Sequence, residues 1–234
     1  IDDNVFRGKI PGIKTIHLDN SNIGEYAFAD NVGIEKVTIS AASEGFTITS
    51  IGNHAFEGCV GLTDLVLPAS VNSLGSHAFY GCTSLVSVNI LNGITQIKPY
   101  TFYNCSSMVD VILPQTVVSI GEYAFYGCSD MIEINIPREI KTIPNYAFYG
   151  CSSLVMISIP DAVTDIGDYA FYGCLAMHSV DMSNQCISIG NYAFYNCKTL
   201  ILTAFPDSLK SIGNYAFASC SKLTDISIGD SIEI

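Results

Sequence analysis

Apolar residues recur along this chain at a fixed interval of 23 residues. Phenylalanine marks the interval most clearly, because eight copies from Phe56 to Phe217 are each separated by that distance, as Phe79 is from Phe56. A cysteine follows each of these phenylalanines by three residues, as Cys128 follows Phe125. Chance does not hold two residue types in register through eight copies. The chain is therefore an internal repeat, and a repeat of this length predicts a solenoid of stacked units.

Each unit contains one segment with the alternation of a half-buried strand. In residues 154–159, Ile157 and Ile159 are predicted to point inward, while Met156 and Ser158 point outward. Proline often follows this segment, which suits a residue that has no N–H for a ladder bond. Ten such strands are predicted, and they begin at Ile13, Ile34, Leu62, Leu85, Met108, Met131, Leu154, Met177, Leu200 and Leu223.

The phenylalanine half of each unit predicts a short helical or 3₁₀ turn. Glycine or asparagine lies two residues after the phenylalanine, as at Gly127 and Asn104, and fits a left-handed residue that ends such a turn. The glycine before the turn, such as Gly121, does not supply a positive φ, because Pro144 takes its place in one unit. The turns are bulkier than the strands, so we expect the sheet to be concave and the turns to be convex.

These motifs resemble the leucine-rich repeats of the BspA type, which occur in surface proteins of anaerobic bacteria and some parasitic protists. The sequence AFYGC at 124–128, followed by MIEINIP at 131–137, carries the resemblance, which extends from about Phe6 to Ile232. It implies an α/β repeat, a right-handed leucine-rich-repeat solenoid with a parallel β-sheet on the concave face and short helical or 3₁₀ turns on the convex face. It also implies an exported protein that binds proteins of a host or neighbouring cell.

We expect a single domain over residues 1–234, made of about ten units and truncated at both ends. The chain begins at Ile1 without an initiator methionine and stops within a repeat. The signal and anchor of a cell-surface or secreted protein are therefore expected outside this segment. Three departures from the repeat are Asn31 in a cysteine position, an insertion at 40–50 whose Phe46 is predicted to fold back, and Thr203 in an inward strand position.

Composition narrows the classes of partner. The net charge is −12 with 10 Lys and Arg, so a nucleic-acid interface and attraction to an anionic membrane are not expected. No apolar run approaches the roughly 20 residues of a membrane span. Hydrophobic residues make up 49% of the chain, which is enough for an extended core and argues against disorder.

The nine cysteines allow two interpretations. A ladder of thiols could bind metal or form disulfides between units, or the column could consist of small buried residues. Cys186 takes a position that other units fill with an aliphatic residue, and no pair has the close spacing of a metal site. We favour buried free thiols and predict no metal site and no cofactor.

Two columns of tyrosine flank the phenylalanines, one two residues before and one directly after, as Tyr123 and Tyr126 flank Phe125. They could form an aromatic strip that binds sugar or peptide on the convex side, or each ring could pack over the next unit. We favour packing. His54 and His77 take the first tyrosine position and are interpreted as surface substitutes.

The outward strand positions vary between units while the inward positions hold, so folding constrains only the core. We therefore predict that the sheet face binds a protein partner, with Met156, Leu202 and Ala204 adding an apolar patch. The candidate partner-binding residues are Asp64, Asn89, Asp110, Glu133, Asn135, Met156, Asp181, Leu202 and Asp225.

The function predicted from these observations is a non-catalytic, adhesin-like binding module. Carboxylates on adjacent units could approach one another as in a glycosidase. An open, regular sheet offers no water-excluding pocket, however, so no enzyme and no catalytic residue are predicted. The alternatives are a structural spacer and an accessory domain of a larger surface protein or hydrolase. The oligomeric state stays open.

Overall fold

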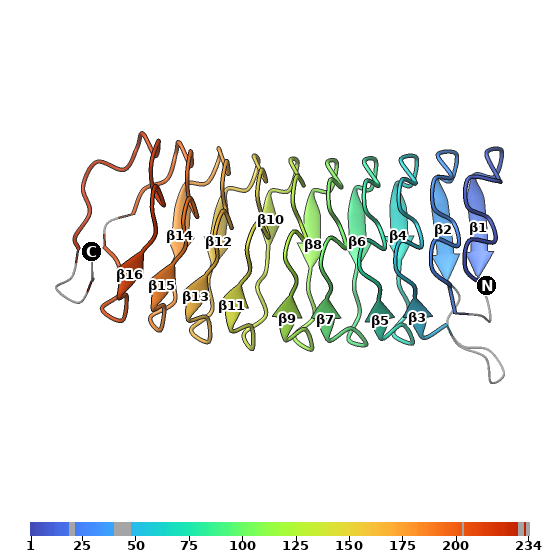
Figure 1. Cartoon of the computed structure of the whole chain (residues 1–234), viewed down its shortest axis with the longest axis horizontal. Coiled ribbons are helices and arrows are strands. Elements are labelled where there is room, and N and C mark those ends of the chain that lie inside the picture. The colour runs from blue at the N-terminus through green and yellow to red at the C-terminus, as the bar shows by residue number, and fades with distance from the viewer. Residues whose placement is uncertain (19–21, 40–47, 203, 229–231, 233–234) are drawn as a thin grey trace.

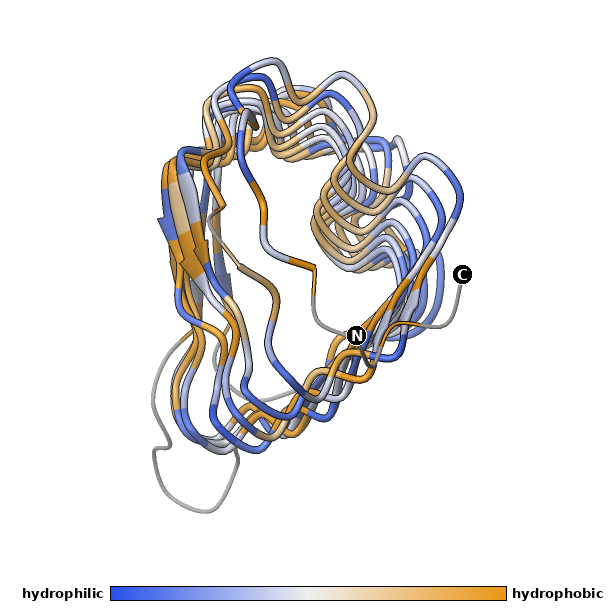
Figure 2. Ribbon diagram, turned by 90° about the vertical axis from the view of Figure 1, so that its left-hand side faces the viewer, coloured by the Kyte–Doolittle hydropathy of each residue, from blue (hydrophilic) through white to orange (hydrophobic). Residues whose placement is uncertain are grey.

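The protein is a stack of similar coils that follow one another along a single axis (Figure 1). The computed structural model describes residues 1–18, 22–39, 48–202, 204–228 and 232. Each 23-residue repeat forms one coil, and the view along the stack shows the coils superimposed around a shared interior (Figure 2). The predicted solenoid is therefore confirmed. The predicted positions of Phe46 and Thr203 lie outside the described residues.

The first side of the stack is a parallel sheet built from the predicted strands. Its hydrogen-bonded order is β1-β2-β4-β6-β8-β10, and β12 and β14 form a separate pair further along the stack. The inward and outward alternation is confirmed in β8, where Val111 is 2% exposed and Ile112 is 72% exposed. In the last two predicted units, the described residues of this side form one isolated bridge, between Ala204 and Ser227. The strands are β1 (Thr15–Leu18), β2 (Lys36–Ile39), β4 (Asp64–Val66), β6 (Ser87–Asn89), β8 (Asp110–Ile112), β10 (Glu133–Ile134), β12 (Met156–Ser158) and β14 (Ser179–Asp181).

A second side of the stack carries two-residue strands that the sequence analysis does not predict. Each consists of an outward residue, usually serine, followed by an inward aliphatic residue. They form three parallel ladders, β3-β5, β7-β9 and β11-β13-β15-β16. The strands are β3 (Ser50–Ile51), β5 (Ser73–Leu74), β7 (Gln96–Ile97), β9 (Ser119–Ile120), β11 (Thr142–Ile143), β13 (Asp165–Ile166), β15 (Ser188–Ile189) and β16 (Ser211–Ile212).

The glycine that follows each second strand permits close approach of neighbouring coils. A Cβ added to Gly190 would lie 2.5 Å from Asp168 Oδ1 and 2.6 Å from the carbonyl carbon of Gly167. Lys98 and Pro144 occupy this position in two coils, and there the ladder is interrupted, between β5 and β7 and between β9 and β11. A glycine at this position donates its main-chain N–H to the preceding coil, as Gly167 donates to Ile143 O at 2.8 Å. Pro144 has no N–H and cannot form this bond. The glycine is thus required for contact between coils rather than for its φ.

The predicted helical or 3₁₀ turns are not confirmed, because the described residues form no helix of either type. Tyr123 and Gly127 both have left-handed φ values, 59° and 70°, so the chain around Phe125 cannot continue as a helix. Successive N–H groups instead alternate in direction. Phe125 N–H donates to Ala147 O of the next coil at 2.9 Å, whereas Tyr126 N–H donates to Tyr123 O within the turn. The left-handed glycine is confirmed, and the left-handed tyrosine is a new finding.

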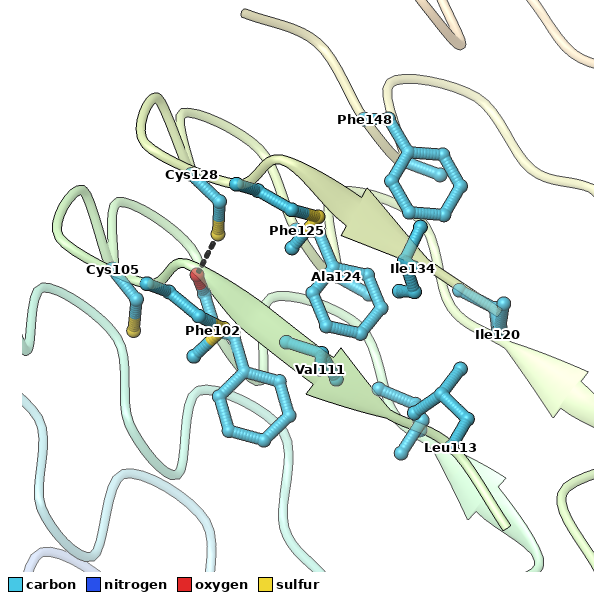
Figure 3. Close-up of a cluster of buried hydrophobic side chains, with 14 of the residues drawn as sticks. Phe102, Cys105, Val111, Leu113, Ile120, Ala124, Phe125, Cys128, Ile134 and Phe148 are labelled. Carbon is cyan, nitrogen blue, oxygen red and sulfur yellow. Dashed lines mark hydrogen bonds between the residues drawn. The ribbon is translucent and has the colours of Figure 1, made fainter. Parts of the chain in front are cut away.

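The interior is a column of phenylalanines beside a column of cysteines (Figure 3). Neighbouring phenylalanine rings stack with centroids 5.6 Å apart for Phe102 and Phe125, and 5.5 Å for Phe125 and Phe148. Cys128 Sγ donates to Phe102 O of the preceding coil at 3.3 Å. The nine cysteines are free and buried, as predicted, and burial raises the pKa of the Cys151 thiol to about 12. The Cys151 thiol is therefore a protonated, weakly reactive core residue.

Asn31 shows what the cysteine position requires. Its Nδ2 donates to Phe6 O at 2.7 Å and to Phe28 O at 2.8 Å, so the asparagine bonds the phenylalanine carbonyl of the preceding coil just as the cysteines do. Asn31 is 1% exposed, so its amide lies in a buried site where polar groups are normally hydrogen-bonded. The shared property of this column is a small hydrogen-bond donor.

We predict that Gly190→Ala destabilises the protein by about 1–3 kcal/mol, because the new methyl group must push apart the coils that carry β13 and β15. Urea unfolding followed by circular dichroism measures this change. Gly12→Ala is the matched control, because a Cβ at Gly12 meets nothing within 4 Å. Equal stability of the two variants would contradict the close-approach explanation.

We predict that Cys128→Ala lowers the free energy of unfolding by about 0.5–1.5 kcal/mol, because Phe102 O loses the donor of the next coil and keeps only Cys105 N–H, at 3.2 Å. Cys128→Ser retains a donor and should lose less. The same urea titrations compare the two variants. If serine is no better than alanine, the hydrogen bond does not explain why this column repeats.

Candidate partner-binding surface

The predicted site residues of the first sheet form two outward columns. In the first column, Asp110 lies beside Glu133 in the strand register. In the second column, Asn89 lies beside Ile112. Adjacent strands are about 4.8 Å apart, so neighbouring members of a column can contact the same partner group. Eight of the nine predicted site residues are exposed on this side of the stack: Asp64, Asn89, Asp110, Glu133, Asn135, Met156, Asp181 and Asp225.

The prediction that Leu202 belongs to this exposed surface is wrong. Its side chain is 8% exposed and faces the interior, whereas the preceding Ile201 is 48% exposed. The prediction extended the strand alternation into a coil in which the described residues form only the Ala204 bridge. The apolar side chains exposed on the sheet face are instead Val66, Ile112 and Met156.

A hollow of about 520 Å³ lies in the sheet face over three consecutive coils. Its lining consists of the same three strand positions in each coil, residues 110–112, 133–135 and 156–158. Five of these residues are aliphatic or methionine, and the polar ones include two carboxylates, Asp110 and Glu133. The hollow therefore combines apolar contact with negative charge.

The side chain of Asn135 explains why the face is hollowed here. Its Oδ1 accepts from Leu113 N–H at 2.8 Å and its Nδ2 donates to Leu113 O at 2.8 Å, so the side-chain amide bonds both main-chain groups of one residue. The amide lies along the sheet toward the preceding coil instead of standing on the face. The ladder of the first sheet ends on the other side of β10, because β10 pairs with β8 but not with β12.

The carboxylates of the hollow are available to a partner. None of the four ion pairs among the described residues includes Asp110 or Glu133. Asp181 differs, because its Oδ2 accepts a hydrogen bond from Ser158 Oγ at 3.0 Å. Asp110 and Glu133 are thus adjacent carboxylates on the sheet face that have no hydrogen-bond or ionic partner among the described residues.

Sequence reasoning missed a stripe of exposed aliphatic side chains at the edge of the sheet face. It comprises the residue before the strand in successive coils, and N–H to O bonds join its members, as Ile132 N–H donates to Val109 O at 3.0 Å. The signal was the recurrence of valine or isoleucine directly after the buried leucine or methionine. The members are Val86, Val109, Ile132 and Val155, all exposed except the half-buried Val109. His178 takes this position in the next coil and interrupts the stripe before the exposed Ile201.

The tyrosine columns do not form an aromatic binding strip. Tyr126 stacks on Tyr103 with centroids 4.5 Å apart and on Tyr149 at 4.6 Å, with interplanar angles of 6° and 4°. Both faces of each inner ring are thus covered by its neighbours, and a sugar would need an open face. The packing interpretation is confirmed, and the sheet face is the better candidate surface.

Two histidines continue the first tyrosine column. His54 and His77 stack on each other at 4.4 Å, and His77 also stacks on Tyr100 at 4.5 Å. Burial lowers the pKa of His77, and the neighbouring His54 lowers it further, while Glu57 opposes the shift. The His54 Nδ1 contacts the Glu57 carboxylate. The folded protein therefore favours neutral His77.

No group of three or more His, Cys, Asp or Glu side chains that could hold a metal occurs among the described residues. Within the same part of the chain, no helix has the length and apolar character needed to cross a membrane.

The stacked coils and their repeated motif define a repeat protein of the leucine-rich class. The sequence matches the BspA type leucine rich repeat region, in six copies, over residues 21–155 and 119–234. The chain belongs to this family. Comparison with curated proteins finds no sequence match.

Solved structures of bacterial proteins share the fold. The chain is 24% identical to a leucine rich cell surface protein from Faecalibacterium prausnitzii, with a TM-score of 0.51 over 99% of this chain and 77% of that one. It is 24% identical to a leucine rich repeat protein of T. pallidum, with a TM-score of 0.55 over 91% and 84%. The pneumococcal vaccine antigen PcpA is 20% identical, with a TM-score of 0.51 over 97% and 70%. These structural similarities show a common fold.

We predict that stability decreases as the pH falls below about 6.5, the ordinary pKa of histidine. His77 has a lowered pKa in the folded state, so the unfolded chain binds the proton first and acid favours unfolding. Urea titrations at pH 7.5 and 5.5 should therefore differ less for His77→Tyr than for the unchanged protein. Tyr146→Phe, in the same column of stacked rings, is the control, because it keeps His77 and should retain the full difference between the two pH values.

Proposed function

We propose that this chain is a non-catalytic protein-binding module of a cell-surface or secreted protein, and that the first sheet is its binding face. The observation that carries the proposal is the exposure of large apolar side chains on a face that also carries unpaired carboxylates. Ile112 and Met156 are 72% and 57% exposed. Exposed apolar residues gathered in one place are typical of interaction sites.

The variation between coils supports the same face. Positions that face the core keep their residue type from coil to coil, whereas the outward column at Asp110 holds serine, aspartate, glutamate and methionine in neighbouring coils. Folding needs none of this variety. The tyrosine-bearing side varies less, and its stacked rings are covered by one another. A concave curvature of the sheet, which would increase contact with a partner, stays a prediction.

A cell-surface location and an adhesin-like role agree with the family and with the Faecalibacterium relative, whose structure is that of a cell surface protein. The partner is proposed to be a protein on a host or neighbouring cell. The proposal includes no nucleic acid, because the net charge of −12 opposes a polyanion.

The test uses three substitutions that remove charge from the sheet face, Asp110→Asn, Glu133→Gln and Asp181→Asn. Immobilised protein is incubated with fractionated surface proteins of candidate partner cells, and retained proteins are identified and then purified for titration. The triple variant should bind the purified partner about tenfold less tightly, because charge complementarity is lost, while its stability stays close to that of the unchanged chain.

The matched control removes the same charge outside the sheet, through Glu122→Gln, Glu139→Gln and Asp207→Asn, all at exposed positions. This control should bind as the unchanged protein does. Equal binding of the two triple variants would reject the sheet face. Failure to retain any protein would favour a structural spacer instead.

A further inference from the structure

The hollow in the sheet face coincides with two other irregularities of the repeat. The ladder of the first sheet stops between β10 and β12, and the Asn135 side chain replaces a rung of that ladder by bonding Leu113. Elsewhere in the six-stranded sheet the rungs are formed by the main chain, as between β6 and β8. Three features thus involve β10 and its two neighbouring coils, and a regular repeat would produce none of them.

The position of the Asn135 amide leaves space above β10. Ile112, its neighbour in the column, stands on the face and is 72% exposed, whereas the Asn135 amide is held against the preceding coil. Met156 rises on the far side of the gap. The hollow is therefore walled by two apolar side chains and has an open space of about 520 Å³ between them.

The charge of the hollow selects its occupant. Asp110 and Glu133 are register neighbours on the same side of the gap, and no cation among the described residues pairs with either. An anionic or purely apolar group would leave these carboxylates without a partner in a place where contact removes water. A basic side chain with a long alkyl stem satisfies both the charge and the apolar walls.

We propose that this hollow binds an arginine or lysine side chain from an extended segment of the protein partner, with an adjacent apolar side chain lying against Ile112 and Met156. This inference rests on the proposed function and specifies which part of the sheet face determines its specificity. Arginine fits best, because its planar guanidinium can bond two carboxylates through separate N–H groups. The open side of the hollow admits a chain that continues beyond it, which favours a peptide segment over an enclosed small molecule.

The probe is a capped, fluorescein-labelled octapeptide with the central sequence Arg-Ser-Leu-Ser-Arg. Alternate residues of an extended chain face the same way, so arginine and leucine reach the sheet together. A second peptide replaces arginine by glutamate, and a third replaces leucine by serine. Fluorescence anisotropy measures binding, and amide chemical shifts of the ¹⁵N-labelled protein locate it.

We expect the arginine–leucine peptide to bind and to shift the amides of residues 110–112, 133–135 and 156–158. Asp110→Asn with Glu133→Gln should weaken its binding about fivefold or more, and Met156→Ser should weaken it about threefold. The matched control is Asp64→Asn with Val66→Ser, which makes the same kinds of change on β4 outside the hollow and should have no effect. The β8 counterparts of Asp64 and Val66 are Asp110 and Ile112.

Equal binding of the glutamate peptide, an equal effect of the β4 variant, or shifts confined to other coils would overturn the proposal. Absence of binding by all three peptides would overturn it as well. The broader function is tested separately by the purified partner. If the sheet-face triple variant loses that partner while the arginine peptide fails, the binding face stands and the basic occupant of the hollow is wrong.

Discussion

The distance between neighbouring coils is the constraint on which the rest of this structure depends. Each coil lies one strand spacing from the next, and main-chain hydrogen bonds hold most coils there on three sides. These bonds belong to the first sheet, to the two-residue ladders, and to the turn in which Phe125 N–H donates to Ala147 O. Residue types that recur every 23 positions are those that fit this spacing. Phenylalanine stacks across it, cysteine donates across it, and glycine allows it where a Cβ would collide.

The same spacing decides which surface can bind. On the turn side, tyrosine rings 4.5 Å apart cover one another, so the periodicity that aligns them also removes their faces from solvent. On the sheet side, the side chains stand away from the backbone and do not need to match their neighbours. Variation is tolerated there without cost to the stack, and polar, acidic and apolar residues follow one another along each column. A solenoid therefore separates its stabilising columns from its variable ones.

Features tied to one residue type could be predicted from sequence, whereas features that depend on a neighbouring coil could not. The burial of Phe125 and Cys128 and the alternation of β8 followed from repetition and hydrophobicity. The left-handed φ of Tyr123 did not, because tyrosine rarely adopts it and the stacking that holds it lies between coils. Two-residue strands are too short for an alternation to be recognised. Leu202 was misplaced because the prediction assumed a strand where the described residues form a single bridge.

The spacing between coils also explains the effects of residues that depart from the repeat. Lys98 and Pro144 carry the Cβ that the close approach excludes, and the second ladder stops beside each of them. Asn135 has a different effect, because its amide replaces main-chain bonds while the buried Ile134 and Ile136 on either side keep the core intact. A substitution of this kind changes the shape of the surface and preserves the interior. A repeat protein can thus acquire a local recognition site through one polar side chain, without an insertion and without disturbing the stack of coils that supports it.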